Sequence, residues 1–159
     1  MALEPNVAVD FINGVSDAFR AGDPAIDVKS AETDNVAALM RQFQCVADND
    51  WAGFADLLDE DAGLEIVGPP SVPFRGRWKG RRETAATVQR NFGLLEGQKP
   101  ELISIIAQGD MVVVHARETG RVKATGAEYA FEFVQFHTFR AGRSVACRQL
   151  VVEIVPDAG

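Results

Sequence analysis

Two histidines are the residues of this 159-residue chain best suited to chemistry, and the sequence contains no others: His115 and His137. Arg117 follows the first by two positions, and Gln135 precedes the second by two. In a β-strand, residues two apart point to the same face, so each histidine shares a face with its polar neighbour. A neutral imidazole works as a general base or acid near pH 7, and an arginine can hold a carboxylate or stabilise an enolate. The pattern predicts proton-transfer chemistry.

A structural role explains the same residues and stays open. A lone histidine on a mostly apolar strand is more often a hydrogen-bonded core residue than a catalytic one. Arg117 can pair with a carboxylate on a helix or reach solvent. Gln135 and Gln149 can hydrogen-bond each other across neighbouring strands.

Other kinds of site find little support. Cys45 and Cys147 lack metal-binding spacing and are typical of small buried apolar groups. Cys147 and His137 can be considered as a nucleophile and base, but nothing in the sequence marks the thiol as activated. No glycine-rich phosphate loop and no GxSxG motif occurs. We therefore expect no metal and no cofactor.

The elements that must position these residues follow from hydrophobic periodicity. Helices are predicted first, and long strands joined by tight turns come last. The predicted helices begin near residues 33, 51 and 81, and the third ends at Gly97. The predicted strands cover residues 62–67, 102–108, 111–123, 127–140 and 144–155, with an irregular loop over 68–80. This order is typical of an α+β domain whose helices lie on one face of a curved sheet.

The N-terminal segment carries its own helical pattern. Apolar residues repeat every four positions from Val7 to Phe19, and Gly22 and Pro24 end the run. We therefore divide the chain into an N-terminal helical extension, residues 1–31, and a main domain, residues 32–155.

Five segments of the main domain, in their order and spacing, resemble the nuclear transport factor two-like superfamily, which includes SnoaL-like and ketosteroid isomerase-like proteins. These segments are Asp50–Ala62, Phe74–Arg81, Ala107–Val114, Gly120–Gly126 and Phe136–Arg143. The resemblance covers residues 34–153. It implies a cone-shaped, strongly curved and mostly antiparallel sheet wrapped around three helices, with an apolar cavity inside the cone and the N-terminal helix as an addition.

The resemblance also argues against one mechanism. Ketosteroid isomerase uses an aspartate base with an oxyanion hole made by a tyrosine and an aspartic acid. Aligned on this chain, the base falls on Ile66, the tyrosine on Gln42 and the acid on Gln135. An isoleucine cannot take a proton, and the neighbouring Glu65 points to the opposite face by strand alternation.

The same alignment predicts which strand faces look into the cavity. The candidate catalytic residues are His137 and His115. The candidate ligand-binding residues are Ile66, Trp78, Val113, Arg117, Phe133, Gln135, Cys147 and Gln149. The resemblance and these residues predict a small-molecule-binding protein, with isomerase, cyclase or dehydratase chemistry on an apolar oxygenated ligand as its enzymatic form.

Composition bounds the partners. A formal net charge of −7 argues against nucleic-acid binding, which needs a concentrated basic surface. No segment is apolar enough for a membrane span, so we expect a cytoplasmic protein. The pattern Val112, Val114, Val134 and Phe136 is assigned to the outer sheet face, and it predicts a homodimer. The alternative function is a non-catalytic dimerisation or protein-interaction domain.

Overall fold

The structure, a computed structural model, describes residues 26–27 and 32–155. The helices are α2 (Thr33–Ala47), α3 (Trp51–Asp56) and α4 (Arg81–Gly93). The strands are β1 (Ile26–Asp27), β2 (Leu58–Val67), β3 (Gly76–Lys79), β4 (Leu95–Gln108), β5 (Met111–Val122), β6 (Glu128–Arg140) and β7 (Arg143–Glu153). The predicted N-terminal helix lies outside the described residues, and the proposed extension over residues 1–31 stays a prediction.

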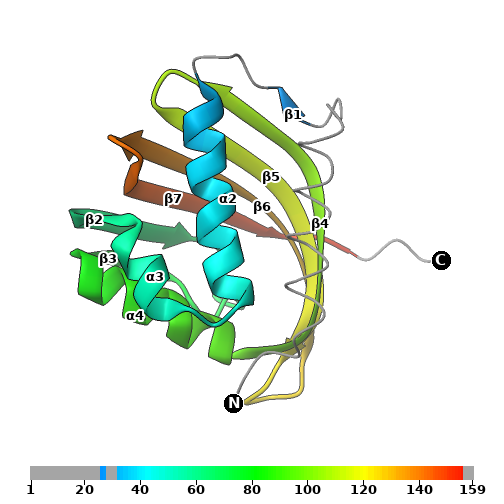
Figure 1. The fold of residues 1–159 in the computed structure, drawn as a ribbon. Helices are drawn as coiled ribbons and strands as arrows, with labels where there is room; N and C mark the ends of the chain where they lie inside the picture. Colours follow the sequence, from blue (N-terminus) through cyan, green and yellow to red (C-terminus); the bar gives the residue numbers. More distant parts are fainter. Residues whose placement is uncertain (1–25, 28–31, 156–159) are drawn as a thin grey trace.

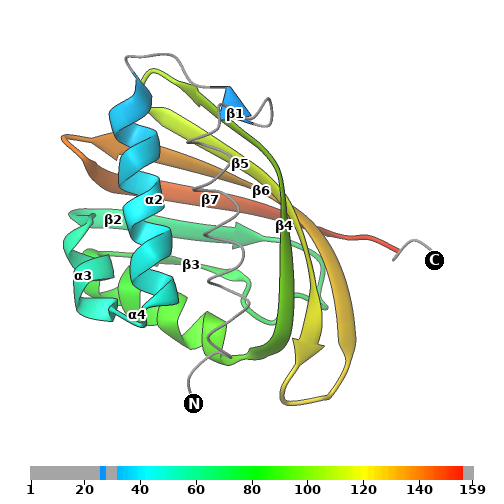
Figure 2. The same cartoon turned by 45° about the vertical axis from the view of Figure 1, so that its right-hand side comes forward.

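One curved sheet runs through the domain in the order β1-β4-β5-β6-β7-β2-β3. Strands β4 to β7 form an antiparallel meander, whereas β2 pairs with β7 in parallel. Figures 1 and 2 show the long strands bending around α2, α3 and α4, which all lie on the concave side. The α+β class and the curved, mostly antiparallel sheet are therefore confirmed.

The helices form where their apolar residues meet that concave side. Val36 and Leu39 of α2 are fully buried and pack with Ile105 and Val114 of the sheet. The short helix α3 begins at Asp50, whose side chain accepts a hydrogen bond from the Gly53 backbone N–H at 2.8 Å. Helix α4 begins after Gly80, whose positive φ of 96° suits a glycine.

Several predicted boundaries are wrong. Strand β2 begins at Leu58 rather than residue 62, and the predicted loop over 68–80 contains the short strand β3. Helix α4 ends at Gly93 rather than at Gly97, and Gly97 lies inside β4, which starts at Leu95 rather than at residue 102. The register of β4 with β5 shifts between Glu96 and Lys99, around the positive φ of Gly97. The glycine therefore marks a bulge in a strand and not the end of a helix.

Cross-strand register decides which residues face the helices. On β5, Val112, Val114 and Ala116 are at most 1% exposed. On β6, His137 pairs with Val112 and Gln135 pairs with Val114. Residues paired in this way share one face of the sheet, so even-numbered residues of β5 and odd-numbered residues of β6 lie together on the concave face.

Candidate functional site

A cavity of about 210 Å³ lies between the concave face of the sheet and the helices. Its wall is mainly apolar and includes Phe43, Phe54, Ile66, Phe92, Phe131 and Phe133. Pockets for drug-sized ligands usually measure roughly 300–1,000 Å³, so this one suits a small molecule. The apolar wall forms because β2, β6 and β7 turn alternate apolar side chains toward α4 and α2.

One polar group inside the cavity is a chain of three side chains from β6 and β7. The ring Nε2 of His137 lies 3.0 Å from Gln135 Oε1. The Gln135 amide in turn donates to Gln149 Oε1 at 2.9 Å. All three residues line the cavity. The predicted bond between the two glutamines is confirmed.

These contacts fix the protonation of the buried histidine. Because Gln135 Oε1 only accepts, His137 Nε2 carries the hydrogen and donates it. Burial lowers the pKa of His137 to about 4, so the ring is neutral at pH 7. Its Nδ1 is buried and has no hydrogen-bond partner among the described residues. His137 is therefore a neutral ring with one unsatisfied acceptor.

Cys147 lies beside this histidine without forming a reactive pair. Its Sγ is 4.0 Å from His137 Nε2, so the structure brings the two residues together. Burial raises the pKa of the Cys147 thiol to about 12. The thiol keeps its proton at neutral pH, and a thiolate is the form that attacks. The arrangement argues against a cysteine nucleophile.

A second polar group holds a carboxyl in the cavity wall. Glu118 of β5 accepts hydrogen bonds at Oε1 from the Tyr129 hydroxyl, at 2.6 Å, and from the Gln98 amide, at 3.3 Å. Burial raises the pKa of Glu118, although both hydrogen bonds oppose that shift. Burial also raises the pKa of Tyr129, so the phenol keeps its hydrogen and acts as the donor. Sequence analysis missed this group.

The missed carboxyl has a visible sequence signal. Val112, Val114, Ala116 and Glu118 continue one alternating set along β5, and the first three are core residues. Taking the apolar members of this set as the inward face would have placed Glu118 inside. The alternative set, which carries His115, contains more polar residues.

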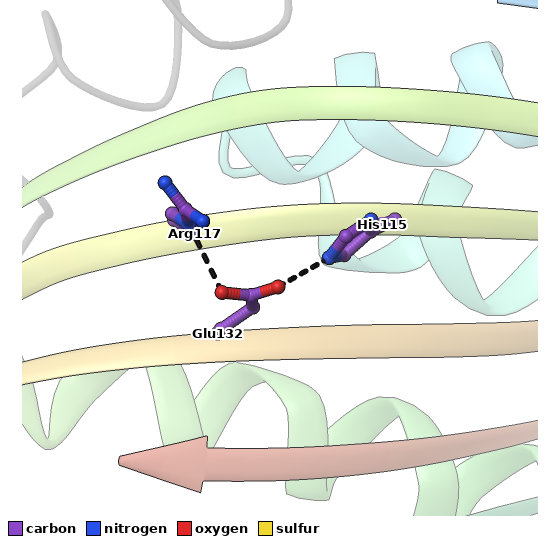
Figure 3. Close-up of polar contacts among 3 residues, drawn as sticks. All are labelled: His115, Arg117 and Glu132. Atoms are coloured by element: carbon purple, nitrogen blue, oxygen red, sulfur yellow. Dashed lines mark hydrogen bonds and ion pairs between the residues drawn. The ribbon is translucent and has the colours of Figure 1, made fainter. Parts of the chain in front are cut away.

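The predicted site residues on β5 lie on the other face of the sheet. The assignment of Val113, His115 and Arg117 to the cavity is wrong. The even-numbered residues of β5 face the cavity, so the predicted inward set is shifted by one residue. Figure 3 shows His115 and Arg117 reaching across the strands to Glu132 of β6. The distances to its two carboxylate oxygens are 2.7 Å from His115 Nε2 and 3.0 Å from Arg117 Nε.

The other predicted residues divide clearly. Ile66, Phe133, Gln135, Cys147 and Gln149 line the cavity with His137. Trp78 of β3 is not among the residues that line it and packs against the apolar cluster of Leu64, Ile66 and Val72.

The three positions aligned with the isomerase machinery all lie at the cavity: Gln42, Ile66 and Gln135. None of these side chains ionises. Glu65 points away from the cavity as predicted, and it forms ion pairs with Arg77 at 2.8 Å and Arg148 at 3.6 Å. The aspartate base of ketosteroid isomerase thus has no counterpart at these positions. Among the described residues, no cluster of three or more His, Cys, Asp or Glu could hold a metal ion.

Comparisons with known proteins agree with this geometry. The SnoaL-like domain family matches residues 39–147. Among solved structures, an NTF2-like protein from Burkholderia xenovorans LB400 is 24% identical, with a TM-score of 0.66 over 76% of this chain and 90% of that chain. An M. tuberculosis LEH-like epoxide hydrolase is 19% identical, with a TM-score of 0.60 over 76% of this chain and 84% of that chain.

A third similar structure contains a ligand. TerC, co-crystallised with polyporic acid, is 21% identical, with a TM-score of 0.58 over 73% of this chain and 89% of that chain. No curated protein sequence matches the chain. Identities this low establish a shared fold, whereas function depends on the residues of the site.

Proposed function

The chain belongs to the SnoaL-like domain family, and from this premise we propose that it binds a small apolar, oxygen-bearing molecule in its cavity. The observation that carries the proposal is the composition of the cavity wall. Aromatic and aliphatic side chains form most of it, and a minority of polar side chains, among them the groups around His137 and Glu118, interrupt it. A few polar groups in an apolar wall are typical of sites that orient a small ligand.

The polar chain of β6 and β7 supports recognition of a ligand oxygen. Gln149 accepts from Gln135 through its carbonyl oxygen. Its own amide N–H groups then remain to donate, and Gln149 lines the cavity. A ligand carbonyl or hydroxyl oxygen is the matching acceptor.

Proton-transfer chemistry of the isomerase, cyclase or dehydratase type is the enzymatic form of this proposal. His137 is the histidine that lines the cavity, and its ring is neutral at pH 7. The nitrogen without a hydrogen is Nδ1, which is buried, so action as a base requires a side-chain movement that opens Nδ1 to the ligand. His115 takes no part in this proposal because it faces away from the cavity. One of the similar structures is an epoxide hydrolase, so a protein with this fold can be an enzyme.

The test measures binding of 2-acetylnaphthalene, a small aromatic ketone, by ligand-observed NMR and by calorimetry. Val88 of α4 lines the cavity, so Val88→Trp should fill it and abolish binding. Val113→Trp makes the same change on the convex face and should leave binding intact. Circular dichroism establishes that both variants fold. Mass spectrometry of small molecules copurified with the wild type then identifies candidates for the natural ligand.

Equal binding by the wild type and Val88→Trp would place the ligand outside the cavity. The proposal would be defeated if the wild type neither bound this ketone nor copurified with any small molecule.

Homodimerisation through the convex face is a second proposal. The expected outward pattern needs correction, because Val112 and Val114 are core residues. Other convex residues leave apolar side chains in solvent: Ile106 is 48%, Leu150 38% and Val152 55% exposed. A two-fold contact between two copies is the commonest way to cover such a surface.

Analytical ultracentrifugation should show that the wild type is a dimer. Leu150→Glu should shift the protein to the monomer. A wild type that is monomeric at tens of micromolar contradicts this proposal.

We also propose a cytoplasmic location. Cys45 and Cys147 are both free thiols, which persist best in reducing compartments. No helix in the described part of the chain is long and apolar enough to cross a membrane.

A further inference from the structure

We infer that Glu118 is the proton-bearing group of the cavity, and that its Oε2 donates a hydrogen bond to a carbonyl oxygen of an uncharged ligand. The inference rests on the proposed small-molecule binding and makes it more specific. It assigns a binding subsite on β5, in a part of the cavity separate from His137, and names the class of ligand.

Hydrogen-bond geometry divides the two oxygens of this carboxyl. Tyr129 and Gln98 both donate to Oε1, from β6 and β4 respectively. An oxygen that accepts two hydrogen bonds has no place for a proton, so a proton on this carboxyl resides on Oε2. That oxygen makes no hydrogen bond with the described residues and is not among their buried unpartnered atoms. Because Glu118 lines the cavity and Oε2 keeps some accessible surface, we assign Oε2 to the ligand.

The backbone is adapted to hold this arrangement. Gly120 pairs with Tyr129 across β5 and β6. A Cβ on Gly120 would lie 2.6 Å from the Tyr129 hydroxyl oxygen. The missing side chain therefore lets the tyrosine lie across β5 and reach Glu118. The ring of Tyr129 also stacks on Phe131, with centroids 4.6 Å apart, which fixes its direction.

The surroundings favour the protonated carboxyl. The described residues that line the cavity include no lysine or arginine. Among the described residues, Tyr129 is the titratable group that shifts the pKa of Glu118, and Gln98, Pro100 and Phe131 beside it are uncharged. Desolvation raises the pKa of Glu118 above its ordinary value, and no cation in the described part of the chain offsets this.

The lack of a positive charge among the described residues around Glu118 restricts the class of ligand that can bind there. A carboxylate ligand would meet no countercharge in the described cavity wall and would be repelled once Glu118 ionises. An uncharged ketone, aldehyde or quinone-type oxygen accepts the proton of Oε2 in a hydrogen bond. Glu118 pairs with Phe131, and Phe131 to His137 spans roughly 20 Å of strand. The Glu118 subsite is therefore distinct from the polar chain at His137.

The experiment compares two probes, the neutral 2-acetylnaphthalene and the anionic 2-naphthoate, between pH 5 and 9. The wild type should bind the ketone more tightly than the carboxylate and lose ketone affinity as pH rises through the pKa of Glu118. Glu118→Gln keeps a donor and should bind the ketone without that pH dependence. Glu118→Leu removes the donor and should bind the ketone about tenfold more weakly at low pH.

Glu132→Gln is the matched control, since it alters a carboxyl on the opposite face of the same sheet. It should keep the wild-type pH profile. Carboxyl-¹³C NMR of glutamate-labelled protein provides an independent readout, because the resonance lost in Glu118→Gln should titrate above the ordinary glutamate range.

Outcomes separate the two proposals. Ketone binding that is pH-independent and equal in the wild type and Glu118→Leu overturns this inference and leaves the cavity proposal standing. A Glu118 resonance that titrates at or below the ordinary glutamate value also overturns it. Failure of the wild type to bind either probe defeats the binding function, and this inference with it.

Discussion

The two faces of the sheet each carry one histidine, and they treat it in opposite ways. On the concave face, His137 is 5% exposed and neutral, and its Nδ1 lacks a partner in the described structure. On the convex face, His115 shares the Glu132 carboxylate with Arg117, and its side chain is 33% exposed. The concave histidine is buried beside neutral side chains, whereas the convex histidine belongs to a partly exposed ion cluster. The face of the strand, and not the residue type, determines what an imidazole can do here.

The same contrast applies to the carboxyls. Burial raises the pKa of Glu118 on the concave face. Hydrogen bonds from His115 and Arg117 lower the pKa of Glu132 on the convex face. A carboxyl whose pKa is raised holds its proton more readily and is suited to recognising an uncharged ligand, whereas one whose pKa is lowered is suited to solvent or a polar partner.

The largest expected effect comes from placing a charge on each face of β5. Val114→Asp buries an unpaired carboxylate and should cost roughly 3–5 kcal/mol of unfolding free energy. Val113→Asp, one residue away on the convex face, should cost about 1 kcal/mol or less. Urea denaturation measures both. Similar losses for the two variants would show that the faces are not distinct.

The pH dependence of stability should isolate His137. The pKa of its ring is about 4 when folded, against an ordinary value of 6.5. Between these values the unfolded state binds more protons, so acid favours unfolding. The stabilisation is complete above pH 6.5 and is lost as pH falls to 4, by roughly 3 kcal/mol in total.

His137→Gln should remove that part of the slope in denaturation curves recorded across this pH range. His115→Gln, made on the convex face, keeps His137 and should keep the slope that His137 supplies. Loss of the slope in His115→Gln and not in His137→Gln would reverse the assignment of the two histidines.

The smallest effect is expected from Glu132→Gln. The cluster is partly exposed, so water and salt already screen its charges. The change in the denaturation midpoint should be small and should shrink further at high salt. A large loss that salt does not reduce would mean that the cluster is covered, for instance by a second copy of the chain.

Local sequence patterns predicted much of this molecule. Apolar residues at helical spacing predicted α2, and alternating residues bounded by Gly109-Asp110 and Ala141-Gly142 predicted the hairpins. Alternation also predicted that Phe133, Gln135 and His137 share a face, which the cavity confirms. These predictions succeed because the period of a helix or strand is a property of the backbone alone.

Tertiary structure decided which face of each strand looks inward. Alternation divides β5 into two sets, but the hydrogen-bond register with β6 assigns them. Gln135 pairs with Gln149 across β6 and β7, so odd numbers match odd, whereas it pairs with Val114 across β5 and β6, so odd matches even. That difference moved His115 outside.

The Glu118 subsite likewise depends on contacts between strands. Tyr129 reaches Glu118 because Gly120, paired opposite it, leaves room for the ring. Gln98 arrives from β4 after the bulge at Gly97 has shifted the register. The sequence by itself determined the elements and their periodicity, whereas only the folded sheet set the register that puts a carboxyl inside the cavity and a histidine outside it.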